Sequence, residues 1–112
     1  MPRHSPASPP IREFELLVLL AVMGLRDDAY PVSIRNAIEA RTRRKVSRAA
    51  VFITLERLES KGFVTSRYGD PTPARSGRAK RFFRETAAGI AVAKDALETM
   101  QAMTKGLGEV LE

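Results

Sequence analysis

The residues of this chain that could do chemistry are its basic ones. Between residues 35 and 84 the sequence has 14 Lys or Arg and only 4 Asp or Glu, so this segment carries a net charge of +10. The rest of the 112-residue chain sums to −4, which gives +6 for the whole. A basic segment between acidic ends is typical of a surface that binds a polyanion such as nucleic acid. The alternative is a cationic surface that contacts only solvent.

The sequence offers little for catalysis or for holding a metal. It has no cysteine, which excludes disulfides, thiolate metal sites and a Cys nucleophile. The one histidine, His4, lies in a proline-rich stretch without a partner residue, and no Gly-rich phosphate loop is present. The longest apolar run, residues 16–23, is too short to span a bilayer, and no signal-peptide pattern precedes it. We therefore expect a cytoplasmic protein that is not an enzyme and has no cofactor.

One helix is expected to present the basic surface, over residues 47–61. Ser47 is suited to cap its start and Gly62 to end it, because glycine adopts the left-handed conformation at low cost. Val51, Leu55 and Leu58 follow the helical period and predict a buried stripe. The opposite face has Arg48, Ala49, Phe52, Ile53, Glu56 and Arg57. A helix buried on one side and basic on the other is suited to the major groove of DNA.

Two further helices are predicted before this one. Residues 13–25 are apolar on almost every side, so we expect one side to pack in the domain and the other against a second subunit. Pro31 suits the first position of a helix over residues 31–41, with Asp27 and Asp28 as capping candidates before it. A short basic connector, residues 42–46, then leads to Ser47. This order predicts a helix-turn-helix.

The period changes after Gly62. Residues 63–68 and 78–85 favour strands, and residues 69–77 between them are rich in Gly and Pro, which predicts a β-hairpin wing. Thr86 is suited to cap a last helix, in which Gly89 weakens only the start. A heptad spacing along this helix predicts a dimer seam made by Ile90, Ala93, Leu97, Met100, Thr104, Leu107 and Leu111.

The expected fold is therefore mainly α with a small β-hairpin, a winged helix-turn-helix followed by a long C-terminal dimerisation helix. We divide the chain into a disordered arm (1–12), a DNA-binding domain (13–86) and the dimerisation helix (87–112), which Gly106 and Gly108 should fray near its end. The candidate DNA-binding residues are Arg44, Lys45, Ser47, Arg48, Ala49, Phe52, Ile53, Thr54, Arg57, Arg75, Arg78, Lys80 and Arg81. The candidate dimer-interface residues are Phe14, Leu17, Leu20, Ile90, Ala93, Leu97, Met100 and Leu107.

The order of these motifs resembles the PadR family of bacterial transcriptional regulators. The resemblance covers residues 13–105 and rests on LLVLLAVMGLRDDAYPVSIRNAIEARTRRKVSRAAVFITLERLESKGFVTSR followed by RAKRFFRETAAG. It implies a winged helix-turn-helix homodimer, of the subgroup with a single C-terminal helix. It further implies that the dimer binds a palindromic operator, usually as a repressor, and pairs through its first and last helices. Several family members bind a small apolar or aromatic effector near that interface.

The chain departs from the family pattern in its aromatic residues. Phe52 stands where the family often has Tyr, and Phe82 and Phe83 stand where it often has two Tyr, so hydroxyl groups are lost. No Trp is present to form a platform for a flat ligand. A different class of function also stays open, in which the winged helix is a protein–protein interaction module and its basic face binds an acidic partner.

Overall fold

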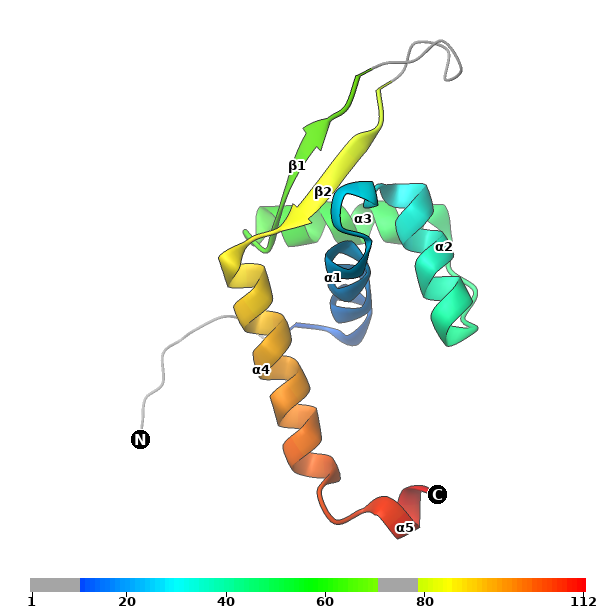
Figure 1. The fold of residues 1–112 in the computed structure, drawn as a ribbon, viewed down its shortest axis with the longest axis vertical. Helices are drawn as coiled ribbons and strands as arrows, with labels where there is room; N and C mark the ends of the chain where they lie inside the picture. Colours follow the sequence, from blue (N-terminus) through cyan, green and yellow to red (C-terminus); the bar gives the residue numbers. More distant parts are fainter. Residues whose placement is uncertain (1–10, 71–78) are drawn as a thin grey trace.

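The computed structural model describes residues 11–70 and 79–112 (Figure 1). Most of the expected arm, His4, most of the wing loop, Arg75 and Arg78 lie outside these residues. The described part consists of α1 (Glu13–Leu25), a 3₁₀ turn (Arg26–Asp28), α2 (Pro31–Thr42), α3 (Arg48–Ser60), β1 (Val64–Tyr68), β2 (Arg81–Glu85), α4 (Ala87–Thr104) and α5 (Gly108–Leu111). This is a mainly helical fold with one two-stranded sheet, as the sequence predicted.

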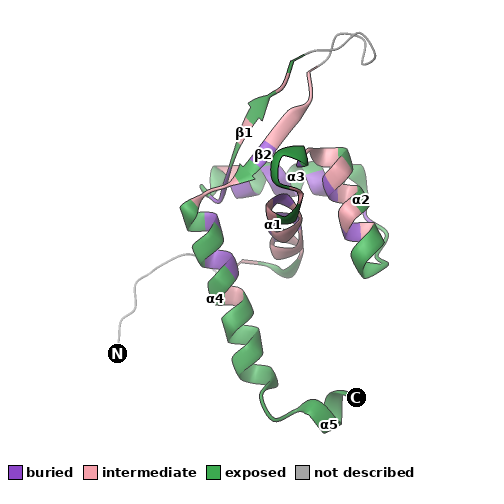
Figure 2. Cartoon of the chain, viewed as in Figure 1, coloured by how far each residue is buried: buried purple, intermediate pink, exposed green. Residues whose placement is uncertain are grey.

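The core is built around α1, which lies between α2, α3, the hairpin and the start of α4 (Figures 1 and 2). Every one of these elements contributes fully or nearly fully buried apolar side chains. They are Val18, Leu19, Val22, Ile34, Ile38, Val51, Leu55, Leu58, Val64, Phe83, Val92 and Ala93. The predicted inner stripe of α3 is therefore confirmed. No helix of the described residues is long and apolar enough to cross a membrane.

A buried carboxylate joins α1 to the end of α3. Glu15 accepts a hydrogen bond from the Arg12 backbone N–H at 3.1 Å and two from Lys61 Nζ at 3.1 Å. Burial raises the pKa of Glu15, but the Arg12 N–H and the Lys61 ammonium outweigh it, and the net pKa lies below its usual value. Glu15 and Lys61 are 46 residues apart, and local sequence patterns did not reveal this pair.

The cap of α2 differs from the one expected. Tyr30, not Asp27 or Asp28, is the N-cap residue, and its backbone N–H donates to Ser33 Oγ at 3.0 Å. Asp27 instead forms an ion pair with Arg84 of β2. The acidic side chain thus fastens the turn to the hairpin.

Helix α3, the hairpin and α4 meet at Phe63. Its N–H donates to Leu58 O at 2.8 Å, and its carbonyl accepts the Thr86 N–H at 3.1 Å. Gly62 has φ +83°, as its role at the end of α3 predicted. Gly89 does more than weaken the start of α4. A Cβ placed there would lie 2.2 Å from Phe63 O, so only glycine lets α4 approach the chain here.

The last predicted helix is confirmed at its start but is not continuous. Thr86 caps it, with Oγ1 accepting from the Gly89 N–H at 3.0 Å, and α4 ends at Thr104. Gly106 has φ +83°, and Leu107 lies between α4 and α5 instead of on one continuous helix. Ala93 was predicted to lie in the dimer seam, but it is buried against the core of its own chain. Beyond it, almost all of α4 is exposed (Figure 2).

Candidate nucleic-acid interface

The exposed face of α3 is the centre of the candidate site. Ser47 caps the helix as predicted, since its Oγ accepts the Ala50 N–H at 3.0 Å. The side chains expected on the outer face are all exposed, and two are large and apolar: Phe52 is 44% and Ile53 50% exposed. The face thus combines the positive end of a helix with basic and apolar side chains.

Thr54 is not part of this face. It is only 5% exposed, because it lies three residues after Val51 and four before Leu58 and therefore on the buried side. Its expected contact with DNA is wrong, and we remove it from the candidate residues.

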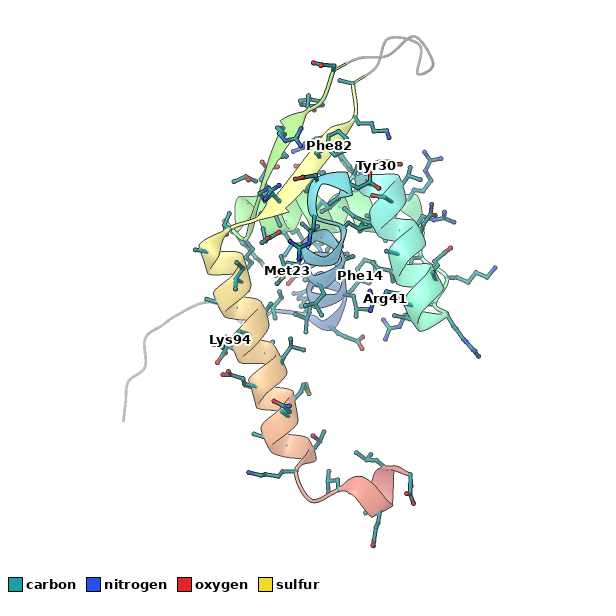
Figure 3. The ribbon with its side chains drawn as sticks, in the orientation of Figure 1. Phe14, Met23, Tyr30, Arg41, Phe82 and Lys94 are labelled. Carbon is teal, nitrogen blue, oxygen red and sulfur yellow. The ribbon has the colours of Figure 1, made fainter. Side chains whose placement is uncertain are left out.

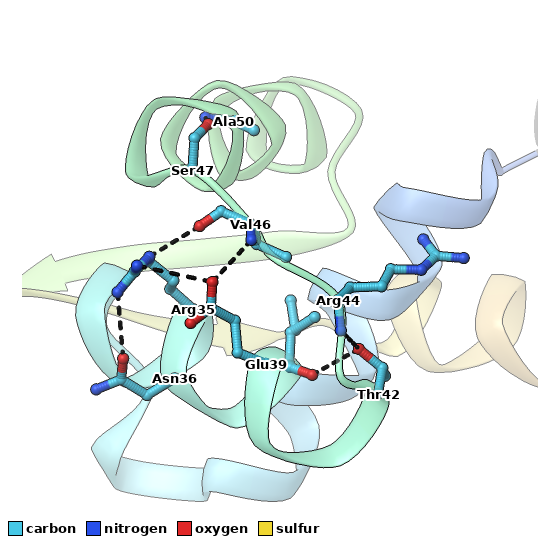
Figure 4. Close-up of polar contacts among 9 residues, drawn as sticks. Arg35, Asn36, Glu39, Thr42, Arg44, Val46, Ser47 and Ala50 are labelled. Carbon is cyan, nitrogen blue, oxygen red and sulfur yellow. Dashed lines mark hydrogen bonds and ion pairs between the residues drawn. The ribbon is translucent and has the colours of Figure 1, made fainter.

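The connector between α2 and α3 is held by a small polar cluster (Figure 4). Val46 donates its N–H to Glu39 Oε2 at 2.8 Å, and its carbonyl accepts from Arg35 Nε at 2.8 Å. Arg35 and Glu39 also pair with each other at 3.6 Å. Sequence reasoning missed both, although their i, i+4 spacing on α2 was a usable signal. The cluster fixes the direction in which the chain enters α3.

Four basic side chains around this helix have no ion-pair partner within the described residues. We call them the connector–α3 cations: Arg43, Lys45, Arg48 and Arg57. All four are exposed. Arg44 differs, because it pairs with Glu13 at 2.9 Å. The free cations therefore lie on the connector before α3 and on α3 itself, from its first turn (Arg48) to its last (Arg57).

The basic side chains of the hairpin are held differently. We call them the wing cations: Arg67, Lys80, Arg81 and Arg84. Lys80 Nζ lies 3.9 Å from the centre of the Tyr30 ring, and Arg67 lies 4.9 Å from that of Phe82. Tyr30 and Phe82 meet edge to face with centroids 5.7 Å apart (Figure 3). These contacts fix the hairpin against the turn before α2. Sequence reasoning had not singled out Tyr30, Arg67 or Phe82 as parts of the site.

Arg81 is the most firmly held of the wing cations. Its guanidinium donates to Glu56 at 2.8 Å, to Glu59 at 2.6 Å and to Ser66 Oγ at 3.2 Å. The hydrogen bond to Glu56 and the charges of both carboxylates raise the pKa of Arg81 despite its partial burial. Arg81 was expected to bind phosphate. In the structure its guanidinium joins β2 to α3, because its planar donors match two carboxylates at once, and the phosphate contact stays a prediction.

A cavity of about 310 Å³ lies between α1 and α2. Its lining is mostly apolar and includes Leu17, Leu20 and Ile38, together with Arg41. The resemblance to the PadR family implied an effector site near the interface of the first and last helices. The cavity shares α1 but uses α2 as its other wall, because α4 contacts α1 only near its own start.

Comparisons with known proteins place this arrangement among solved regulators. No family profile matches the sequence, and no curated protein matches it either. A PadR family transcription regulator from Clostridium difficile R20291 superposes with a TM-score of 0.67 at 18% identity, over 87% of this chain and 98% of that one. A PadR family transcriptional regulator from Eggerthella lenta superposes with a TM-score of 0.67 at 22% identity, over 89% of this chain and 87% of that one. A PadR-like transcriptional regulator from Bacillus cereus superposes with a TM-score of 0.71 at 11% identity, over 88% of this chain and 91% of that one. The resemblance seen in the sequence is thus confirmed at the level of the fold, and this chain has the fold of the PadR-family transcriptional regulators.

Proposed function

We propose that this protein is a DNA-binding transcriptional regulator. The observation that carries the proposal is an exposed helix face that has the connector–α3 cations on it and on the connector before it. A helix with its side chains is about 10–12 Å wide and the major groove about 12 Å, so α3 fits there. The cations beside it would then bind phosphates and set its register.

Recognition by this face combines phosphate contacts with apolar fit. Arg48 and the free N–H groups at the start of α3 lie where a phosphate oxygen would bind. Phe52 and Ile53 are suited to contact thymine methyl groups. The fold of solved transcriptional regulators supports this assignment over the alternative of a module for an acidic protein partner.

We propose further that the protein acts as a homodimer on a palindromic operator, and as a repressor. The operator symmetry and the repressor role are what the resemblance to the PadR family implies. The support for the homodimer is the exposed apolar face of α4, where Leu97 is 45% and Met100 63% exposed. Such a run of exposed apolar side chains is typical of a subunit interface. Ile90, Phe14, Leu17 and Leu20 remain predicted members of it. A two-fold axis would set the paired α3 helices roughly 34 Å apart.

The experiment that tests DNA binding is selection from a random duplex pool, followed by gel shifts with selected and scrambled duplexes. We expect an enriched palindrome with half-sites about one helical turn apart. Arg48→Ala combined with Arg57→Ala should reduce binding to the selected duplex. If the protein binds neither duplex but binds an acidic polypeptide such as polyglutamate, the interaction-module alternative replaces the proposal.

Light scattering tests the dimer. Leu97→Glu with Met100→Glu should give monomers, because two charges would be buried at the interface, and monomers should lose the palindrome preference. The matched control is Thr99→Glu with Ala102→Glu, which adds the same charge on the opposite side of α4. The control should stay dimeric. A seam variant with unchanged mass would contradict this assembly.

A further inference from the structure

Glu56 is an unusual residue for the surface that we propose to bind DNA. It is the one carboxylate on the exposed face of α3, since Glu59 is half-buried and turned to the hairpin. A free carboxylate here would face DNA phosphates and weaken binding. Its neighbours on that face, one turn earlier along the helix, are Phe52 and Ile53, neither of which can accept a hydrogen bond from a base.

Arg81 reduces the electrostatic penalty and fixes the carboxylate in place. Its Nη1 donates to Glu56 Oε2 at 2.8 Å. Arg81 is itself held by Glu59 at 2.6 Å and by Ser66 at 3.2 Å, so Glu56 is tied to a rigid group. Within the described residues, Glu56 Oε1 accepts no hydrogen bond and stays available on the exposed face.

The chemistry of this oxygen selects one base. Cytosine presents an N4 amino donor in the major groove, and a carboxylate is its usual side-chain partner. Adenine also offers an amino group, but its N7 acceptor lies beside it and repels a carboxylate. Guanine and thymine present acceptors, which cannot pair with Glu56.

We propose that Glu56 is a specificity-determining residue that accepts a hydrogen bond from cytosine N4, with Arg81 as its positioning residue. This inference rests on the proposed function, because it assigns one base within the duplex bound by α3. It gives the Glu56–Arg81 pair a role beyond fastening the hairpin to α3.

The test is selection from a random duplex pool with the full chain and with Glu56→Gln. The wild type should enrich one cytosine at the same place in each half-site. Glu56→Gln should move that position to adenine by about tenfold, because an amide pairs with adenine N6 and N7. Glu59→Gln is the matched control: it alters the other carboxylate that holds Arg81 and should keep the cytosine. Thermal unfolding of each variant confirms that it is folded.

Arg81→Gln tests the positioning role with the same readout. It should lower the cytosine preference at that one position while the other positions of the half-site keep theirs. An unchanged cytosine in Glu56→Gln, or a wild-type site without it, would overturn the inference while leaving DNA binding intact. An equal loss at every position in Glu56→Gln and Glu59→Gln would also overturn it, since the pair would then act only on structure. A wild type that binds no duplex would overturn the proposed function itself.

Discussion

The connector–α3 cations and the wing cations lie on either side of the same helix face, yet they are held in opposite ways. Each described basic side chain of the wing contacts a carboxylate or an aromatic ring, as Arg81 does with Glu56 and Glu59. Arg48 and Arg57 have no such ion pair in the part of the chain that the structure describes. A count of basic residues therefore overstates how much charge a surface offers to a ligand. Cations whose charge a carboxylate already balances, as for Arg81 and Arg84, release fewer counterions from DNA than free ones, and a cation held over an aromatic ring is less free to reach a phosphate.

A salt titration of two double variants tests most strongly whether the two groups of cations differ. Arg48→Ala with Arg57→Ala should weaken duplex binding roughly tenfold to a hundredfold and reduce the log–log salt slope by about 3.6, if a dimer loses four phosphate contacts of about 0.9 each. Lys80→Ala with Arg84→Ala removes the same formal charge from the wing. We expect its slope to change by less than about 1. Equal slopes for the two variants would show that the two groups do not differ.

A second prediction concerns stability, where the wing should be the more sensitive region. Arg81→Ala removes the donor to Glu59 Oε1 and to Ser66 Oγ, and Ser66 Oγ alone still donates to Glu59 Oε2, so we expect the free energy of unfolding to fall by about 1–3 kcal/mol. Arg48 has no ion pair with any other described residue, so Arg48→Ala should change the free energy of unfolding by no more than about 0.5 kcal/mol. Urea unfolding at neutral pH measures both. A larger loss for Arg48→Ala would reverse the assignment of the two groups.

The smallest effect is expected for the ion pair between Lys61 and Glu15. Lys61 follows α3, but like the wing cations it has a partner inside the fold. The pKa of its partner Glu15 is lowered on folding, so the pair stabilises the fold fully above the ordinary pKa of a glutamate. This contribution disappears as the pH falls through the lowered value. Glu15→Gln should therefore flatten the loss of stability on acidification, as followed by thermal unfolding from pH 7 to pH 2. A variant with the wild-type pH dependence would show that the pair does not contribute.

The elements of the fold were predictable because their signals are local. Helix starts were predicted correctly at Ser47 and Thr86, whose side chains cap them. The end of α3 was predicted correctly at Gly62, which adopts a positive φ. Thr54 was placed wrongly because the inner stripe was drawn too narrowly from three aliphatic residues. Ala93 was placed wrongly because a heptad pattern does not say whether the cover comes from a partner or from the same chain.

Which cations contact a carboxylate or an aromatic ring of the same chain could not be predicted from the sequence. Arg81 lies 25 residues from Glu56, and Lys80 reaches the ring of Tyr30 only after the hairpin folds back on the turn before α2. These contacts depend on tertiary structure, and no local period marks them. The sequence located the basic surface correctly, whereas only the three-dimensional arrangement separates its free charges from its paired ones.

The close approach of Gly89 to Phe63 has a mechanical consequence. It packs the start of α4 directly against the residue that follows α3, so the two helices should move as one rigid unit. With 18 residues α4 is about 27 Å long, and a tilt of about 10° moves its far end by about 5 Å. In the proposed dimer, small changes in the angle between the two α4 helices would alter the distance between the two α3 helices. The stiffness of this one joint would then decide how much variation in half-site spacing the protein tolerates.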